Sequence, residues 1–217
     1  MGELILRALI IAICSYFLGC FNGSVIVSKY IFRNDIRKHG SGNAGLTNFY
    51  RVFGGPLTVV VIATDFLKAV VALLLGAWLI ADSSVGILAA DPALLGKYWA
   101  ALFCLLGHMF PCMFEFKGGK GILSGGAVLI MLDWRIALIS WGGFLILVAL
   151  TRWVSLGSVW ASGILPFTTW FFFQNPVLTA LGLVCGWLVV WKHKDNIGRI
   201  LKGSERKLTF RSKKKGE

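Results

Sequence analysis

The sequence is poor in charge, and poorest in negative charge. Charged residues make up 15% of its 217 residues, and Asp and Glu number only 10 against 22 Lys and Arg. A hydrophobic fraction of 57% and a mean hydropathy of +0.75 exclude an ordinary soluble domain, so we predict an integral membrane protein. The net charge of +12 leaves nucleic acid, a membrane surface and an anionic substrate open as partners.

Cysteine is also scarce and has no motif spacing. The absence of a C-x-x-C pair excludes a zinc ribbon, and the apolar surroundings of the cysteines do not indicate a disulfide framework. We interpret them as small buried hydrophobic residues. The five cysteines are Cys14, Cys20, Cys104, Cys112 and Cys185.

Long apolar runs are abundant, and each is compared with the roughly 20 residues that a spanning helix needs. Two of the runs, 122–132 and 136–150, are short, and 122–150 has an alternative interpretation as one long helix with a charged middle. The charge distribution favours two helices, because seven spans with the N-terminus outside place 18 of the 22 basic residues on the inner side. The predicted spans are 4–27, 56–81, 98–114, 122–132, 136–150, 153–173 and 176–191.

The predicted fold is therefore an all-α, seven-transmembrane-helix bundle with its C-terminus in the cytoplasm. We predict a single membrane-embedded domain over 1–217, in which 191–217 is a basic cytoplasmic tail. The basic residues follow topology instead of forming a patch interleaved with aromatics, so no nucleic-acid partner is predicted. The tail contacts either anionic membrane lipid or solvent.

The first polar constellation, residues 39–51, lies between the first two predicted spans and has the sequence HGSGNAGLTNFYR. Glycines permit turns that expose backbone N–H groups, and the hydroxyl, amide and guanidinium groups are able to bind one anion together. A turn-rich connector has a similar composition, so this segment alone leaves both interpretations open. Its candidate residues are Gly40, Ser41, Gly42, Asn43, Thr47, Asn48 and Arg51.

The second constellation, FKGGKG at 116–121, opens the fourth predicted span. Glycines let backbone amides approach a phosphate, the following helix presents its positive end, and Lys120 adds a full charge. Phe114 and Gly121 stand where a Walker A sequence needs Gly and Ser or Thr, which disfavours nucleotide hydrolysis. A basic turn that sets topology is the alternative. The candidate residues are Gly118, Gly119, Lys120 and Gly121.

The third constellation, residues 191–205, follows the last predicted span. In a helix, His193 and Asn196 share one face and are able to point back toward the bundle. A basic juxtamembrane helix with an incidental asparagine is the alternative. Because topology places all three constellations on one side of the membrane, we favour a common site.

Three further polar residues lie within predicted spans. Asp65 and Lys68 are three positions apart, so they are predicted to pair, and a functional and a structural role both stay open. His108 lies alone in an apolar run and is interpreted as a buried histidine bonded to backbone. No metal site is predicted, because nothing around it is spaced like a set of metal ligands.

Taken in order, the three constellations resemble the bacterial acyl-phosphate-dependent glycerol-3-phosphate acyltransferase family of small integral membrane enzymes. The resemblance covers essentially the whole chain and includes Asp65-x-x-Lys68 and the GHMFP segment at 107–111. It implies transfer of a fatty acyl group from acyl phosphate to the 1-hydroxyl of sn-glycerol 3-phosphate, giving lysophosphatidate and phosphate. This is the first acylation step of phospholipid synthesis, performed without a cofactor.

The resemblance also implies a location and partners. The enzyme is expected in the bacterial plasma membrane with its active site on the cytoplasmic side, and a functional link to an acyl-phosphate-producing enzyme is implied. The implied catalytic residues are Ser41, Arg51, Lys120, His193 and Asn196. The implied binding and shaping residues are Gly40, Gly42, Asn43, Thr47, Asn48, Gly118, Gly119, Gly121 and Glu205. The sequence departs from the family pattern at Leu46, Ala69 and Leu123-Ser124.

The residues fit this chemistry on independent grounds. An acyl phosphate is a mixed anhydride with a good leaving group, so a site mainly has to orient two phosphate-bearing molecules and stabilise charge. The His-x4-Asp motif of other glycerolipid acyltransferases is absent, and either His193 or the substrate's own phosphate is able to accept the hydroxyl proton. A carrier for an organic phosphate is the alternative function. Another membrane lipid transferase is disfavoured, because the Asp-Gly…Ala-Arg signature of alcohol phosphatidyltransferases is missing.

Overall fold

The computed structural model describes residues 2–82 and 91–208, and within these ranges all regular structure is helical. The predicted all-α class is thereby confirmed, while the end of the predicted tail, 209–217, lies outside the described residues. The α-helices are α1 (Gly2–Cys20), α2 (Gly23–Ile26), α3 (Leu46–Val52), α4 (Leu57–Ile80), α5 (Pro92–Met109), α6 (Ile122–Leu132), α7 (Trp134–Thr151), α8 (Val154–Gly163), α9 (Leu165–Phe173), α10 (Pro176–Lys192) and α11 (Lys194–Leu201). Short π- and 3-10 turns cover Val27–Ile31, Ile36–Lys38 and Cys112–Phe114.

Five helical segments of the described chain are long and apolar enough to cross a membrane, and α10 with α11, bent by 59°, makes a sixth if the pair is one span. The apolar helix α6 is shorter than these. Large apolar side chains such as Trp78, Leu150 and Phe171 are exposed on the outside of the bundle, as expected of a surface that faces lipid. The seven-span count and the outside N-terminus stay predictions.

Three of the predicted spans are broken in the structure, and in the run predicted at 98–114 the helix α5 ends at Met109. The run predicted at 4–27 ends its first helix at Cys20, and the Asn22 side chain caps α2 by accepting a hydrogen bond from the Val25 amide. The run predicted at 153–173 is divided at Ile164 into α8 and α9. Between 122 and 150, Asp133 caps α7 by accepting from the Arg135 amide, so two helices replace the single long one.

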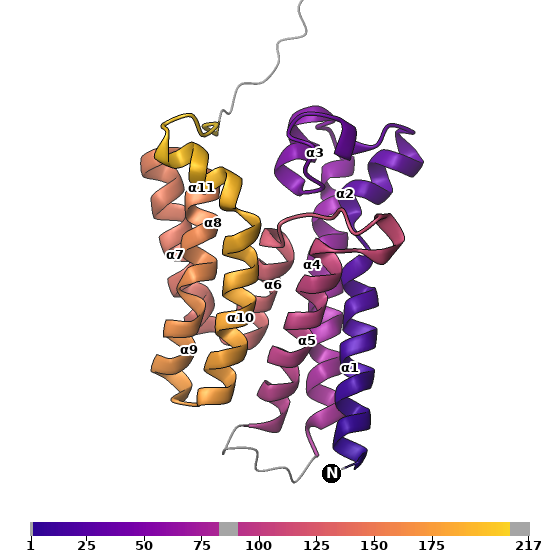
Figure 1. The fold of residues 1–217 in the computed structure, drawn as a ribbon, viewed down its shortest axis with the longest axis vertical. Helices are drawn as coiled ribbons and strands as arrows, with labels where there is room; N and C mark the ends of the chain where they lie inside the picture. The colour runs from indigo at the N-terminus through magenta and orange to yellow at the C-terminus, as the bar shows by residue number, and fades with distance from the viewer. Residues whose placement is uncertain (1, 83–90, 209–217) are drawn as a thin grey trace, which may run out of the picture.

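The helices form two groups with α6 between them (Figure 1). Helices α1, α4 and α5 pack on one another, and α7, α8, α9 and α10 make the other group. Close approach of α4 and α5 depends on Gly76 and Gly96, because a Cβ on either one would overlap the backbone of the other helix.

All three polar constellations lie at one end of this bundle. Helices α3 and α11 are at that end, and Gly2, at the start of α1, is at the opposite end (Figure 1). The fold therefore brings together segments that are more than a hundred residues apart in the sequence.

Candidate active site

The loop of the first constellation is wrapped around one side chain. The buried Asn48 on α3 accepts a hydrogen bond from the Ser41 amide at 2.9 Å and donates to the carbonyl oxygens of His39 and Asn43, each at 3.0 Å. Gly40 has a φ of +62°, and a Cβ there would overlap the Asn48 side chain. Asn48 thus organises the loop, while the Arg51 side chain is exposed and has no ion-pair partner among the described residues.

The glycine loop of the second constellation packs on the end of α5. The Gly118 and Gly119 amides donate to the carbonyl oxygens of Met109 and His108 at 3.2 and 3.1 Å. These two amides are therefore not available to a phosphate, which corrects the prediction that they approach one. A Cβ at Gly119 would overlap the His108 imidazole, so close packing explains the glycine here.

The second and third constellations together supply a cluster that we call the cavity cluster, Lys120, Asn196 and Glu205. The Lys120 ammonium donates to Asn196 Oδ1, and Asn196 Nδ2 donates to Glu205 Oε1 at 2.7 Å. Glu205 also accepts from Ser155 Oγ at 2.8 Å and from Arg199 Nε at 2.7 Å. A carboxylate thereby orients the amide that orients the lysine.

The pKa values of this region reflect burial and charge. Burial, together with the nearby Arg199, lowers the pKa of Lys120. Burial alone would raise the pKa of Glu205, but hydrogen bonds from Asn196, Ser155 and Arg199 outweigh it and lower that pKa. Burial lowers the pKa of His193 to about 4, so its imidazole is neutral at physiological pH.

His193 is held in one orientation at the end of α10. Its Nδ1–H donates to the Val189 carbonyl oxygen at 2.7 Å, since a carbonyl is only able to accept. The neutral ring therefore has its lone pair on Nε2, for which the described residues supply no hydrogen-bond partner. His193 is able to accept a hydrogen bond from a ligand.

A second polar group, which we call the membrane cluster, consists of Asp65, Lys68 and His108. Lys68 Nζ lies 2.8 Å from Asp65 Oδ1, which confirms the predicted pair, and 2.8 Å from His108 Nδ1. The prediction that His108 bonds to backbone through its side chain is therefore wrong, because its ring partner is the Lys68 ammonium. At the break before α2, the Phe21 carbonyl accepts from Lys68 at 2.8 Å and the Gly23 amide donates to Asp65 at 3.2 Å.

One cavity of about 500 Å³ collects most of the predicted residues. Ten of them line it: Ser41, Asn43, Thr47, Asn48, Arg51, Lys120, Gly121, His193, Asn196 and Glu205. Asp65 of the predicted pair lines it as well. Gly40, Gly42, Gly118 and Gly119 do not, and they act on the loop backbone instead.

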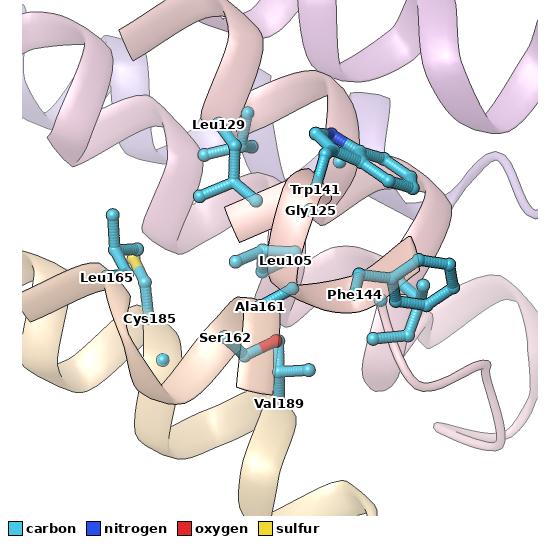
Figure 2. A pocket seen from close by; sticks show the side chains of 15 residues that line it. Leu105, Gly125, Leu129, Trp141, Phe144, Ala161, Ser162, Leu165, Cys185 and Val189 are labelled. Carbon is cyan, nitrogen blue, oxygen red and sulfur yellow. The ribbon is translucent and has the colours of Figure 1, made fainter. Parts of the chain in front are cut away.

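A small apolar pocket of about 30 Å³ adjoins this cavity among α6, α7, α8 and α10. Figure 2 shows it with Trp141 and Phe144 of α7, and with Cys185 and Val189 of α10. The two rings also line the large cavity, as do Gly121 and Ile122. Polar and apolar ligand parts are therefore able to lie side by side.

Known proteins are similar to this chain in sequence. The family model described as Glycerol-3-phosphate acyltransferase matches residues 9–203. The chain belongs to the glycerol-3-phosphate acyltransferase family. It is 34% identical over 201 residues to the glycerol-3-phosphate acyltransferase of Thermoanaerobacter pseudethanolicus, which covers 93% of this chain and 96% of that protein. It is 35% identical over 198 residues to that of Fusobacterium nucleatum, covering 91% and 96%.

A solved structure of the same family is also similar. The crystal structure of PlsY (YgiH), an integral membrane glycerol 3-phosphate acyltransferase, in its glycerol 3-phosphate form gives a TM-score of 0.80 at 32% identity, covering 93% of this chain and 96% of that one. Its lysophosphatidic acid form gives 0.76 at the same identity. The predicted family, the predicted acyltransferase activity and a multi-pass membrane protein of phospholipid synthesis are confirmed.

Several cavity residues of this acyltransferase family member had no part in the sequence prediction. Ser155 and Ser158 are three positions apart on α8, and Arg199 and Arg206 come from the C-terminal segment. The serine spacing within an apolar run was a usable signal, because it places two hydroxyls on one helix face. Arg199 and Arg206 had no such signal among ten basic residues of the tail.

Proposed function

We propose that the protein transfers a fatty acyl group from acyl phosphate to the 1-hydroxyl of sn-glycerol 3-phosphate. The products are 1-acyl-glycerol 3-phosphate and inorganic phosphate. The observation that carries this proposal is the single cavity in which Arg51, Lys120 and His193 meet beside an apolar pocket. Relatives that bear the name glycerol-3-phosphate acyltransferase support the acceptor.

Two phosphate groups are bound by cations that keep N–H donors not used by the described residues. Lys120 has Asn196 as its described partner, so two of its three N–H groups are free for a ligand. Arg51 presents a guanidinium fork without a described carboxylate partner. Ser41 and Asn196 position the substrates, and the cations lower the free energy of the departing phosphate.

The chemical step needs no covalent intermediate with the protein. The oxygen of the 1-hydroxyl attacks the carbonyl carbon, the bond from that carbon to the phosphate oxygen breaks, and the electron pair leaves with the phosphate. The hydroxyl proton ends on that phosphate. A pKa of about 4 makes His193 a weak base, so its Nε2 accepts a hydrogen bond that orients the hydroxyl, and the proton then passes to the phosphate oxygen as the bond from the carbonyl carbon to phosphate breaks.

The acyl chain enters laterally from lipid beside the apolar pocket of Figure 2, whose volume of about 30 Å³ is too small to enclose the chain. Trp141 and Phe144 line both the apolar pocket and the large cavity. An acyl phosphate with its carbonyl group in the large cavity is therefore able to extend its acyl chain between α7 and α8. The active site faces the cytoplasm of a bacterial cell, which is supported by the basic segments at the end of the bundle opposite Gly2 (Figure 1).

The test is an assay of purified protein in detergent with a long-chain acyl phosphate and glycerol 3-phosphate. We expect stoichiometric release of inorganic phosphate and formation of 1-acyl-glycerol 3-phosphate, measured by mass spectrometry. Acyl coenzyme A and acyl carrier protein are offered separately as donors. A requirement for either thioester would overturn the proposed donor.

The alternative of an organic phosphate carrier is tested in sealed vesicles. Accumulation of labelled glycerol 3-phosphate without acylated product would favour the carrier, and product formation without accumulation favours the enzyme.

A further inference from the structure

We propose that His108 is a further catalytic residue, which donates a hydrogen bond from Nε2–H to the carbonyl oxygen of the bound acyl phosphate. The proposal rests on the function proposed above. It extends the site into the membrane cluster, where His108 and Asp65 form part of the wall of the large cavity.

The Lys68 ammonium determines which nitrogen of His108 has the proton. Lysine has three N–H donors and no acceptor. In Lys68 all three are directed at acceptors, namely the Phe21 carbonyl oxygen, Asp65 Oδ1 and His108 Nδ1, each at 2.8 Å. Nδ1 therefore accepts, and the proton of the neutral ring is on Nε2.

The Nε2–H group has no acceptor among the described residues. His108 is only 2% exposed, and a Cβ on Gly119 would overlap its Nε2 and would lie 3.0 Å from the Ala44 carbonyl oxygen. Among the described residues no hydrogen bond joins His108 Nε2 to that carbonyl, which accepts from Asn22 Nδ2 at 3.0 Å. A buried donor that lines a cavity without a protein partner is a donor for a ligand.

The surroundings indicate which ligand atom receives this hydrogen bond. Gly119 is followed by Lys120, and Ala44 lies between Asn43 and Gly45, and these three neighbours all line the cavity. The phosphates have Lys120 and Arg51 as their charged partners. The carbonyl oxygen gains negative charge when the hydroxyl attacks, and an uncharged donor held in place stabilises that charge.

Two near-isosteric variants separate this role from a structural one. In His108→Gln the amide nitrogen takes the place of Nε2–H, whereas in His108→Asn the amide oxygen takes the place of Nδ1 and still accepts from Lys68. We expect His108→Asn to lose roughly 100-fold in kcat, the size of effect of one lost oxyanion donor, with a near-normal KM for glycerol 3-phosphate. We expect His108→Gln to retain clearly more kcat.

The opposite order contradicts the proposal. If His108 only satisfies Lys68, His108→Asn is the more active variant, and this result would overturn the inference, as would equal activity of the two. Thermal unfolding in detergent is measured for both variants, so that kcat is compared per folded molecule.

A second measurement determines the tautomer of His108 without enzyme turnover. In protein labelled with 15N in its three histidines, the signals missing from His108→Gln identify His108, and we expect its Nε2–H tautomer. An Nδ1–H tautomer would overturn the inference even if the enzyme is active. Inactivity of the wild-type protein with acyl phosphate, in contrast, counts against the proposed function.

Discussion

The membrane cluster and the cavity cluster each contain a half-buried or buried lysine, but they differ in how many lysine donors the protein uses. In the membrane cluster, Lys68 directs all three N–H groups at protein acceptors. In the cavity cluster, Lys120 has one described partner, Asn196, and faces a cavity with its remaining donors. A lysine with every donor satisfied fixes the helices around it, whereas a lysine with free donors is prepared for an anion.

The same contrast holds for the two buried histidines. His108 presents an N–H to the cavity because Nδ1 accepts from Lys68, and His193 presents a lone pair because its Nδ1–H donates to Val189. One ring is therefore a donor and the other an acceptor toward ligands in the same cavity. The difference is made entirely by the partner of Nδ1.

The largest effect is expected from Lys68→Met. This variant leaves the Asp65 carboxylate buried without its cation, and the expected loss is roughly 3–5 kcal/mol in the free energy of unfolding. Thermal unfolding in detergent measures it. The double variant Asp65→Leu/Lys68→Met should lose less than the single one, and a single variant with wild-type stability would contradict the structural role of the cluster.

Lys120→Ala should affect activity far more than stability. Loss of the phosphate-binding charge is expected to lower kcat/KM for glycerol 3-phosphate roughly 100- to 1,000-fold. The matched control is Lys117→Ala in the same loop, since Lys117 is exposed, pairs with Glu115 and does not line the cavity. Equal kinetics of the two variants would remove the distinction between the lysines.

His193 should make stability depend on pH. Burial lowers its pKa in the folded protein to about 4, so the unfolded chain, with a pKa near 6.5, takes up the proton first as the pH falls. The contribution of the neutral His193 ring to the free energy of unfolding is complete above pH 6.5 and is lost as the pH falls toward 4. This contribution decreases by about 2 kcal/mol between pH 8 and pH 5. The difference in melting temperature between these two pH values should be smaller in His193→Gln, and an unchanged difference would count against the buried neutral ring.

The smallest effect is expected from Ser155→Ala, which removes one of the hydrogen bonds to Glu205. A net loss of about 1 kcal/mol corresponds to roughly a fivefold increase in KM for glycerol 3-phosphate. Thr168→Ala on α9 is the control, because its hydroxyl bonds only to backbone carbonyls. A change of the same size in both variants would show that Ser155 does not act through Glu205.

The elements of the fold were largely predictable because they depend on local hydropathy. The charged break at 133–135 ended one apolar run and started the next, and Asp133 indeed caps α7. The Asp65–Lys68 pair was predictable as well, since three residues of helix bring two side chains onto one face. The break at Phe21 and Asn22 was not, because it is stabilised by Asp65 and Lys68, more than 40 residues away.

The composition and order of the motifs by themselves determined a helical membrane protein, its family, and the residue types that gather at one end. Tertiary structure alone decided which of those residues share a cavity, which nitrogen of each buried histidine has the proton, and which glycine amides are already used. The physical reason is that hydropathy and helical periodicity act over a few residues, whereas a hydrogen-bond partner such as Lys68 for His108 depends on how distant helices pack.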